Sequence, residues 1–323
     1  MTDLDQAIRI CADALAAGEL VAFPTETVYG LGADAESPTA VRRIFEAKGR
    51  PTSHPLIVHV DSKRWLSELA VDVPRVAHQL AERFWPGPLT LVVRRSERIP
   101  LAVTGGQPTV ALRVPAHPVA LRLLTAFGRG VAAPSANRFG RLSPTSAKHV
   151  IEDLGDRVAH VLDGGDCEVG VESTIVDVSR EEPRLLRPGG VAREDLEREL
   201  RKPLVHEALG PVRAPGQLAS HYAPRAELIL CSEAELAERV EGLHARGARL
   251  GVLIPTNVAS PNVAAAIRLP ADAASFAHSL YASLRELDAA GSDVIVVVPP
   301  TGAGLGLAVL DRLTRAAAPR PRD

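Results

Sequence analysis

The sequence contains few cysteines, few aromatic residues and no long uninterrupted apolar run. Its three cysteines, Cys11, Cys167 and Cys231, lie far apart and form no CxxC pair, so the sequence indicates neither a zinc site nor a disulfide framework. Aromatic residues make up 3% of the chain, which weighs against recognition of RNA by base stacking. No apolar segment is long enough to span a bilayer, and the start of the chain lacks the pattern of a signal peptide. These absences predict a cytoplasmic protein with no membrane partner.

The charge is nearly balanced, with 37 Lys and Arg residues against 39 Asp and Glu residues and a formal net charge of -2 at pH 7. A protein that holds nucleic acid through its overall charge is strongly basic, so this balance permits at most weak or transient RNA binding. Hydrophobic residues make up 46% of the 323 residues. A chain of this length and composition can bury a large core and is long enough for two domains.

The spacing of apolar residues predicts an α/β protein with two domains. In residues 1–202, short apolar strands and amphipathic helices are mixed without strict βαβ alternation, which favours a twisted mixed sheet over a barrel. Residues 203–226 contain repeated Pro and Gly and no long periodic segment, so we expect a linker there. Residues 227–323 interleave strand-like runs with helices, which is typical of a small, parallel, Rossmann-like α/β domain.

A short helix with well-marked ends is expected near the start of the first domain. Ser37 is suited to cap its N-terminus, Pro38 to stand at its first position and Gly49 to end it. Lys48 and Arg50 flank this glycine. Two cations that lie two residues apart on non-helical backbone can point the same way, as a phosphate-binding site requires. The alternative is a solvated basic turn.

Two other loops carry signals that precede a helix. Ser143 followed by Pro144 predicts a helix that runs to Leu154. The glycine-rich loop 302–306 follows an apolar strand, but it lacks the full G-x-G-x-x-G spacing of a dinucleotide-binding loop. We therefore expect this loop to be the entry to a helix.

Polar residues recur at the ends of the predicted strands and in the adjoining loops of the first domain. Open sheets bind ligands at such ends, where backbone and hydroxyl groups converge. Cationic side chains among several hydroxyls suit a substrate that carries phosphates and a carboxylate. The candidates are Thr27, Lys48, Arg50, His59, Thr109, Arg113, Ser135, Asn137, Ser143, Ser173 and Arg187.

Several of these residues also have a purely structural interpretation. Arg113 at a strand end is equally expected in a surface salt bridge, and His59 in an apolar strand is more often a buried core histidine. Ser135 and Asn137 are also common turn formers. The sequence contains no Ser-His-Asp order, HExxH helix or Walker-type glycine loop. The candidate site therefore suits positioning and charge neutralisation rather than a covalent enzyme intermediate.

The order of several short motifs resembles the YrdC-like family. The motifs of the first domain are PTETVYGLG, AKGRP, HPLIVHV, WPGPLTLV, TVALRVP, APSAN, GVESTIVD and LLRPGG. The downstream APGQLASHYAP and the small α/β tail resemble the longer, two-domain members of the family, the threonylcarbamoyl-AMP synthases. The resemblance covers nearly the whole chain and is most specific up to residue 190.

The resemblance implies a nucleotidyltransferase that joins L-threonine, bicarbonate or CO₂, and ATP into threonylcarbamoyl-adenylate and releases pyrophosphate. Other proteins, the downstream threonylcarbamoyl transferases, then move the threonylcarbamoyl group to the adenosine beside the anticodon of tRNA. The resemblance also implies Mg²⁺ as a cofactor that enters bound to ATP rather than held by a protein metal motif.

The family holds its nucleotide with KxR and SxN motifs, which here are Lys48 with Arg50 and Ser135 with Asn137. The resemblance gives Lys48 and Arg50 the catalytic role of stabilising charge. The implied ATP-binding residues are Lys48, Arg50, His54, Thr109, Asn137, Ser143, Arg187 and Tyr222. The implied threonine-binding residues are Thr27, His59, Arg113, Ser135 and Ser173.

Among the implied ATP-binding residues, His54 departs from the family pattern and Tyr222 lies in the linker. His54 stands where many relatives have asparagine, although its imidazole can still donate to a phosphate. Tyr222 belongs to the linker, which would cover the pocket as a lid.

Two other functions are alternatives. One alternative is an RNA-binding or ribosome-maturation factor of the same family. The other is a carbamoyl-transfer enzyme, but such enzymes carry cysteine-rich or acylphosphatase-like segments that this sequence lacks.

Overall fold

The protein is described here by a computed structural model of residues 3–206, 212, 214–216, 221–300 and 302–319. These residues form two compact units. The first unit comprises Met1–Phe139, Pro144–Glu168 and Glu172–Gln217, and the second comprises Gly140–Ser143, Val169–Val171 and Leu218–Asp323. Of the predicted linker, residues 207–211, 213 and 217–220 lie outside the described residues.

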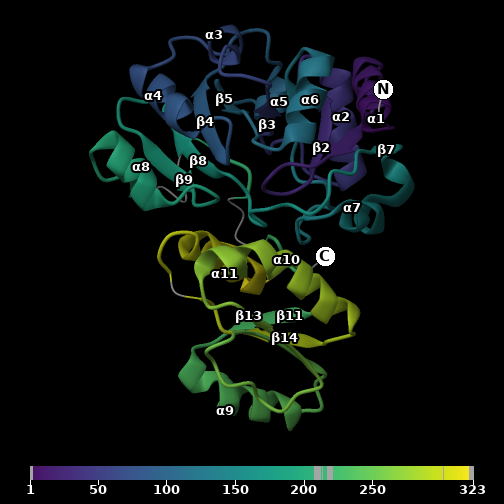
Figure 1. The fold of residues 1–323 in the computed structure, drawn as a ribbon, viewed down its shortest axis with the longest axis vertical. Helices are drawn as coiled ribbons and strands as arrows, with labels where there is room; N and C mark the ends of the chain where they lie inside the picture. The colour runs from purple at the N-terminus through teal and green to yellow at the C-terminus, as the bar shows by residue number, and fades with distance from the viewer. Residues whose placement is uncertain (1–2, 207–211, 213, 217–220, 301, 320–323) are drawn as a thin grey trace. The chain divides into compact units, whose positions relative to one another are not determined.

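Among the described residues of the first unit, ten strands form one mixed sheet (Figure 1). Their order is β10-β9-β8-β4-β5-β3-β6-β2-β1-β7. Parallel and antiparallel pairs both occur, for example β3 with β5 and β4 with β5, so the predicted twisted mixed sheet is confirmed. The strands are β1 (Val21–Phe23), β2 (Gly30–Asp34), β3 (Ile57–His59), β4 (Leu89–Arg94), β5 (Thr109–Arg113), β6 (Val131–Ala132), β7 (His160–Val161), β8 (Thr174–Asp177), β9 (Arg184–Arg187) and β10 (Val205–His206).

Helices cover this sheet through two clusters of buried apolar side chains. The helices are α1 (Asp3–Ala16), α2 (Pro38–Lys48), α3 (Trp65–Leu69), α4 (Arg75–Phe84), α5 (Leu101–Thr104), α6 (Pro118–Phe127), α7 (Ala147–Leu154), the short 3₁₀ helix η1 (Gly155–Arg157) and α8 (Arg193–Leu200). Helices α2, α3, α4 and α5 contribute to the main core. Helices α1 and α6 pack against each other and share a second cluster with β1.

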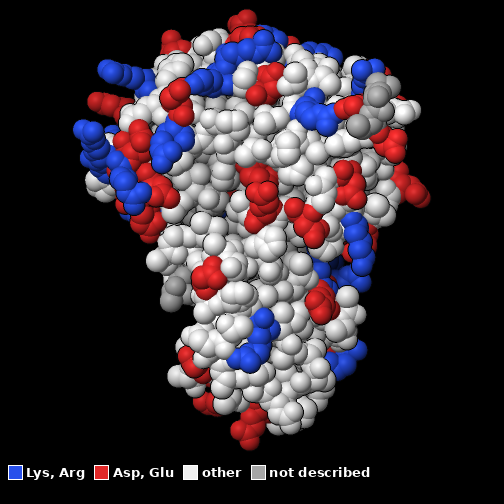
Figure 2. Space-filling view, in the orientation of Figure 1, with Lys and Arg blue, Asp and Glu red and all other residues white. Residues whose placement is uncertain are grey.

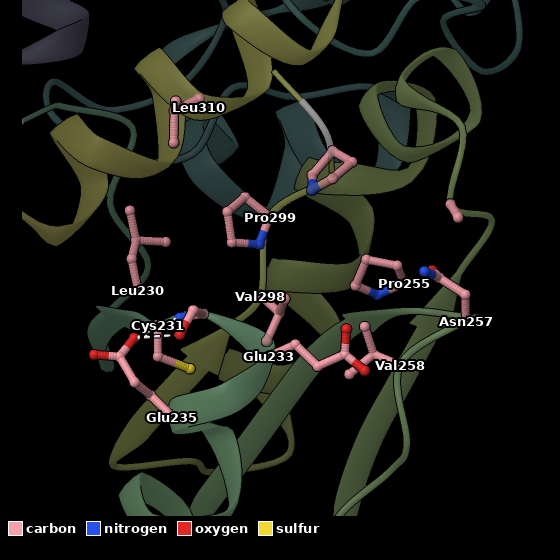
Figure 3. A pocket seen from close by; sticks show the side chains of 13 residues that line it. Leu230, Cys231, Glu233, Glu235, Pro255, Asn257, Val258, Val298, Pro299 and Leu310 are labelled. Atoms are coloured by element: carbon pink, nitrogen blue, oxygen red, sulfur yellow. Dashed lines mark hydrogen bonds between the residues drawn. The ribbon is translucent and has the colours of Figure 1, made fainter. Parts of the chain in front are cut away.

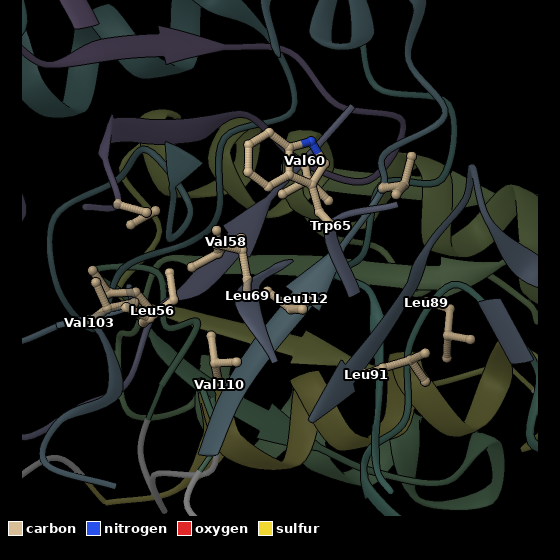
Figure 4. Close-up of a cluster of buried hydrophobic side chains, with 14 of the residues drawn as sticks. Leu56, Val58, Val60, Trp65, Leu69, Leu89, Leu91, Val103, Val110 and Leu112 are labelled. Carbon is tan, nitrogen blue, oxygen red and sulfur yellow. The ribbon is translucent and has the colours of Figure 1, made fainter. Parts of the chain in front are cut away.

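The main core is built from alternate residues of the central strands (Figure 4). Val58 of β3, Leu91 of β4 and Leu112 of β5 are fully buried there, beside Trp65 and Leu69 of α3. Successive side chains of a strand point to opposite faces, so one face of the central strands packs against the helices. The side chains of the intervening strand residues point to the opposite face of the sheet.

The predicted ends of α2 are confirmed. Ser37 accepts a hydrogen bond from the amide of Ala40, Pro38 is the first helical residue, and Gly49 ends the helix in the left-handed region at φ 64°. The predicted start of the later helix at Ser143 is wrong. That helix, α7, begins at Ala147 and is capped by Ser146.

The second unit is a parallel α/β layer structure. Among its described residues, four parallel strands lie in the order β11-β14-β12-β13. Helices α10 and α11 cover one face of this sheet and α9 lies on the other (Figure 1), which confirms the predicted Rossmann-like domain. The elements are β11 (Glu227–Leu230), α9 (Glu233–His244), β12 (Leu250–Pro255), β13 (Ala265–Leu269), α10 (Ala273–Ala289), β14 (Val294–Val297) and α11 (Gly306–Ala317).

Charged side chains are mixed over the surface. Figure 2 shows Lys and Arg interspersed with Asp and Glu on the face that it displays. In the part of the chain that the structure describes, none of the helices is both long enough and apolar enough to cross a membrane.

Candidate active site

Several of the predicted site residues lie on one face of the sheet of the first unit. In β5, Val110 and Leu112 belong to the main core, so Thr109, Ala111 and Arg113 point to the opposite side. We call this side of β3, β5, β4, β8 and β9 the site face. The sequence predicted candidates at strand ends, and Thr109 begins β5 while Arg113 ends it.

The strand register brings side chains of the site face together. His59 of β3 pairs with Arg113 of β5, and Ile175 of β8 pairs with Arg187 of β9. The register of β8 and β9 shifts next to this pair, which leaves Leu186 as an extra residue in β9. Such a bulge changes the direction of the strand and of the side chains that follow. Small and medium-sized apolar residues fill the space between the polar ones: Ile57, Val92, Ala111, Ile175, Leu186 and Ala214.

Arg113 is buried and lies against a carboxylate. Its Nη2 is 2.8 Å from Oε1 of Glu26, and its Nε donates to the carbonyl of Gly87 at 3.4 Å. The neighbouring His59 is also buried, and desolvation together with the positive charge of Arg113 lowers the pKa of His59 to about 3. His59 is therefore a neutral imidazole near neutral pH, able to donate one hydrogen bond and accept another.

Arg187 and Ser173 form a second polar group on the site face. Arg187 donates from Nη2 to the carbonyl and the Oγ of Ser173, at 2.8 Å and 3.1 Å. Its Nη1 donates to the carbonyl of Pro215 at 3.0 Å, and Ser173 Oγ lies 2.7 Å from Thr90 Oγ1. These bonds fix the guanidinium in one orientation, and they attach the described part of the segment before residue 217 to the site face.

Lys48 joins the KxR and SxN motifs. Its side chain is buried, and Nζ donates to the carbonyl of Ser135 at 2.6 Å and also to the carbonyl of Asn137. Burial, and then the charge of Arg50, lower the pKa of Lys48 well below its usual range. Because an anion favours the charged form of a neighbouring amine, Lys48 is suited to a site that receives phosphate.

Arg50 and His54 flank the ring of Phe139. Arg50 donates from Nη2 to the carbonyl of Pro55 at 3.0 Å, and its guanidinium carbon lies 6.0 Å from the centre of the Phe139 ring. The ring of His54 meets Phe139 edge-on, with 5.5 Å between the ring centres. The amide of Phe139 donates to the carbonyl of Lys48 at 2.9 Å. The two motifs and His54 are thus parts of one local cluster.

The remaining predicted residues divide between the two units. Thr27 in the first unit is fully buried, with its Oγ1 2.8 Å from Oγ1 of Thr25. Ser143 and Tyr222 belong to the second unit. Tyr222 is buried there with φ 60°, and the guanidinium carbon of Arg312 lies 5.1 Å from its ring centre. The proposed contacts of Ser143 and Tyr222 with ATP stay predictions.

Sequence reasoning missed two residues of this site, Glu26 and Thr90. Glu26 stands between two threonines in a loop, where a glutamate is usually solvated, yet only 5% of it is exposed. Thr90 lies within an apolar strand, where its hydroxyl gives no signal of its own. The requirement that a buried arginine has a charged partner is the signal that could have found Glu26.

A cavity of about 630 Å³ opens in the second unit (Figure 3). It lies at the carboxyl ends of β11, β12 and β14, beside Leu230, Pro255 and Val298. Its lining residues include Glu233 and Glu235 but no Lys, Arg or His. This lining does not suit phosphate. Among the residues described, no group of three or more His, Cys, Asp or Glu residues is arranged to hold a metal ion.

Two family models match consecutive parts of the chain. The model for Sua5, YciO and YrdC proteins, which is described as "Telomere recombination", matches residues 13–189. The model described as "Threonylcarbamoyl-AMP synthase, C-terminal domain" matches residues 191–318. Together the two matches extend over the site face and the parallel α/β unit.

Curated relatives and a solved structure match almost the whole chain. The chain is 44% identical over 320 residues to the threonylcarbamoyl-AMP synthase of Pyrococcus abyssi, covering 96% of this chain and 93% of the relative. It is 40% identical over 327 residues to the Bacillus subtilis protein of the same name, covering 98% and 94%. The crystal structure of P. abyssi Sua5 complexed with L-threonine has a TM-score of 0.93 at 43% identity, covering 97% of this chain and 94% of that chain. The chain therefore belongs to the Sua5/YciO/YrdC family, as one of its two-domain threonylcarbamoyl-AMP synthases.

Proposed function

We propose that this chain catalyses the formation of threonylcarbamoyl-adenylate from L-threonine, bicarbonate or CO₂, and ATP, with release of pyrophosphate. The observation that carries the proposal is the full-length similarity, at 40% and 44% identity, to proteins named for this product. The product would then supply the threonylcarbamoyl group for tRNA through the downstream transferases. The chain would act in the cytoplasm. Its catalytic domain would comprise residues 1–202, its linker residues 203–226 and its C-terminal domain residues 227–323.

The chemistry needs orientation and charge stabilisation but no enzyme nucleophile. The amine of threonine attacks CO₂, and an oxygen of the resulting carbamate attacks the α-phosphorus of ATP while pyrophosphate leaves. Charge on the phosphoryl oxygens increases in this step, so cations that are already in position lower the barrier. Lys48 and Arg50 are the cations that we assign to this role. Mg²⁺ bound to the phosphates of ATP would supply further charge neutralisation.

We assign the substrates to two neighbouring regions of the first unit. The cluster of Lys48, Arg50, His54 and Asn137 would hold ATP, and the other ATP-binding residues that we assign are Thr109, Ser143, Arg187 and Tyr222. Arg113 would bind the carboxylate of threonine, because its guanidinium offers paired donors. The other threonine-binding residues would be Thr27, His59, Ser135 and Ser173.

Omission of one substrate at a time tests the proposed reaction. Purified protein is incubated with ATP and Mg²⁺, and pyrophosphate release is followed with threonine, bicarbonate or both left out. We expect release to require both. Turnover that is indifferent to both omissions would disprove the synthase assignment.

The RNA-binding alternative has little physical support. The net charge is close to zero, and acidic and basic side chains are interspersed in Figure 2. Tight binding to RNA with a steep dependence on salt concentration would favour this alternative.

A further inference from the structure

The carboxylate of Glu26 is buried on the site face beside the guanidinium of Arg113. Its Oε1 lies 2.8 Å from Nη2 of Arg113, and the two side chains are 6% and 4% exposed. Charged groups are seldom buried to this extent unless they are paired, so each of these two residues accounts for the burial of the other. The pair occupies the place where the carboxylate of threonine is expected.

This ion pair leaves much of the hydrogen-bonding capacity of Glu26 unused. Neither Oε1 nor Oε2 makes an aligned hydrogen bond with any residue in the described ranges, and the same holds for Nη2 of Arg113. An ionised carboxylate can accept about four hydrogen bonds. Leaving such acceptors buried and unused destabilises the protein, and more so for a charged group. Donors from a ligand would remove this penalty.

The loop that carries Glu26 is held in place by its neighbours. Thr25 Oγ1 donates to the carbonyl of Val28 at 2.6 Å and accepts from the amides of Thr27 and Val28, each at 3.2 Å. Thr25, Thr27 and Val28 are all buried. Glu26 is therefore presented from a closed turn rather than from an open loop, and the backbone from which its side chain starts has a defined position.

We propose that Glu26 binds the ammonium group of the amino-acid substrate and that Glu26 and Arg113 together recognise the zwitterion. The proposal rests on the proposed function. The Glu26 carboxylate lies against Nη2 of Arg113, the group that we assign to the carboxylate of the substrate. When the substrate binds, Glu26 turns from Arg113 to the ammonium group. Both charges of an α-amino acid are attached to one carbon, so adjacent groups of opposite charge fit this class of ligand.

Binding measurements with two ligands and two variants test this proposal. The ligands are L-threonine and the hydroxy acid in which a hydroxyl replaces the ammonium group. The full chain, its Glu26→Gln variant and a Glu36→Gln control are compared by calorimetry. Glu36 forms an ion pair with Arg98 away from the site face, so its variant controls for loss of one carboxylate. Binding of ATP to each protein reports whether the first unit is folded.

Glu26→Gln is expected to weaken threonine binding by about tenfold or more, since a hydrogen bond between charged groups contributes about 1.5–3 kcal/mol. Binding of the hydroxy acid is expected to be unchanged or tighter, because the competing carboxylate has been removed from Arg113. The Glu36→Gln control should bind both ligands as the unaltered chain does. Preference for threonine over the hydroxy acid should therefore be lost in Glu26→Gln alone.

Other results would overturn the proposal. An equal loss of affinity for both ligands in Glu26→Gln would mean that Glu26 only positions Arg113. Equal affinity of the unaltered chain for the two ligands would disprove ammonium recognition, even if Glu26→Gln fails to fold. Failure of the proposed function would give different results. The unaltered chain would then bind no threonine, and its rate of pyrophosphate release would not depend on threonine.

Discussion

Lys48 and His59 are basic side chains whose charged forms are disfavoured by burial. The pKa of Lys48 is well below its usual range, and that of His59 is about 3. Arg50 adds to the effect on Lys48, and Arg113 adds to the effect on His59. Protonation of either side chain would place a second positive charge beside an arginine. Binding of phosphates and a carboxylate would relieve this repulsion.

His59 makes the stability of the protein depend on pH. Its pKa is about 3 in the folded protein and has a usual value of 6.5, so the unfolded chain takes up a proton first as the pH falls. The stabilisation is complete above pH 6.5 and is lost as the pH falls toward 3, by up to about 1.4 kcal/mol per pH unit. His59→Gln should therefore show a shallower fall in the free energy of unfolding over this window, measured by urea denaturation.

The control for this prediction is His78→Gln, which alters an exposed histidine on α4. It should leave the pH dependence of the unaltered protein in place. Parallel curves for His59→Gln and the unaltered protein would contradict the account of His59.

Arg50→Ala should abolish turnover and leave the fold intact. The substitution removes a cation that we assign to the phosphoryl oxygens, and loss of such a group lowers the rate by about a hundredfold or more. Pyrophosphate release measures turnover, and circular dichroism with thermal unfolding measures the fold. Arg42→Ala, at an exposed position of α2, should retain full activity. Unchanged kinetics for Arg50→Ala would remove Arg50 from the site.

At the scale of elements, Gly49 shows how the end of a helix positions the site. Its left-handed conformation turns the chain between Lys48 and Arg50, and a Cβ added at Gly49 would meet no atom within 4 Å. Gly49→Ala therefore changes only the backbone energy and should destabilise the protein by about 1 kcal/mol. Gly49→Asn should destabilise it less, because asparagine tolerates this conformation better. Urea denaturation measures both.

A glycine inside a helix provides the opposite case. Gly242 lies within α9, and a Cβ added there also meets nothing within 4 Å. Gly242→Ala should stabilise the second unit by about 0.5–1 kcal/mol. A stabilising Gly49→Ala or a destabilising Gly242→Ala would contradict this view of the two positions.

Local signals in the sequence predicted α2 correctly and α7 incorrectly, although both begin near a Ser-Pro pair. At Ser143 and Pro144, tertiary contacts override the signal. The carbonyl of Pro144 accepts from the amide of Tyr29 at 2.9 Å, and the carbonyl of Thr145 accepts from the amide of Cys167 at 2.9 Å. A helix starting at Pro144 would need both carbonyls for its own hydrogen bonds. No local rule predicts contacts with residues so distant in the sequence.

The strand β2 has no clear signal in the sequence, because GLGAD contains two glycines, which weaken a strand prediction. In the structure, a Cβ on Gly32 would lie 2.7 Å from a methyl group of Val131 and 2.9 Å from the ring of Phe23. The glycine allows this close packing. The candidate site residues were predicted by motif, whereas Glu26 was missed because its burial depends on Arg113, which lies far away in the sequence.

At the scale of the whole molecule, the linker contributes to the site face before it leaves the first unit. Ala214 packs with the apolar residues of this face, and the carbonyl of Pro215 accepts from Arg187. A chain truncated after Gly216 retains these contacts, whereas one truncated after His206 lacks them. The longer chain should be more stable by about 1–3 kcal/mol, because it keeps an acceptor for a buried charged donor.

Urea denaturation compares the two truncated chains, and equal midpoints would contradict the role of Ala214 and Pro215. Both chains should have impaired pyrophosphate release, because both lack Tyr222 and the proposed lid. A fully active truncated chain would show that Tyr222 is dispensable.

The product of the reaction tests the central claim most directly. The protein is incubated with ATP, L-threonine and isotopically labelled bicarbonate, and the nucleotides are analysed by mass spectrometry. The account predicts an adenylate that contains both threonine and the labelled carbon, formed together with pyrophosphate. Release of pyrophosphate with only unlabelled AMP, or with an adenylate that lacks the labelled carbon, would contradict it.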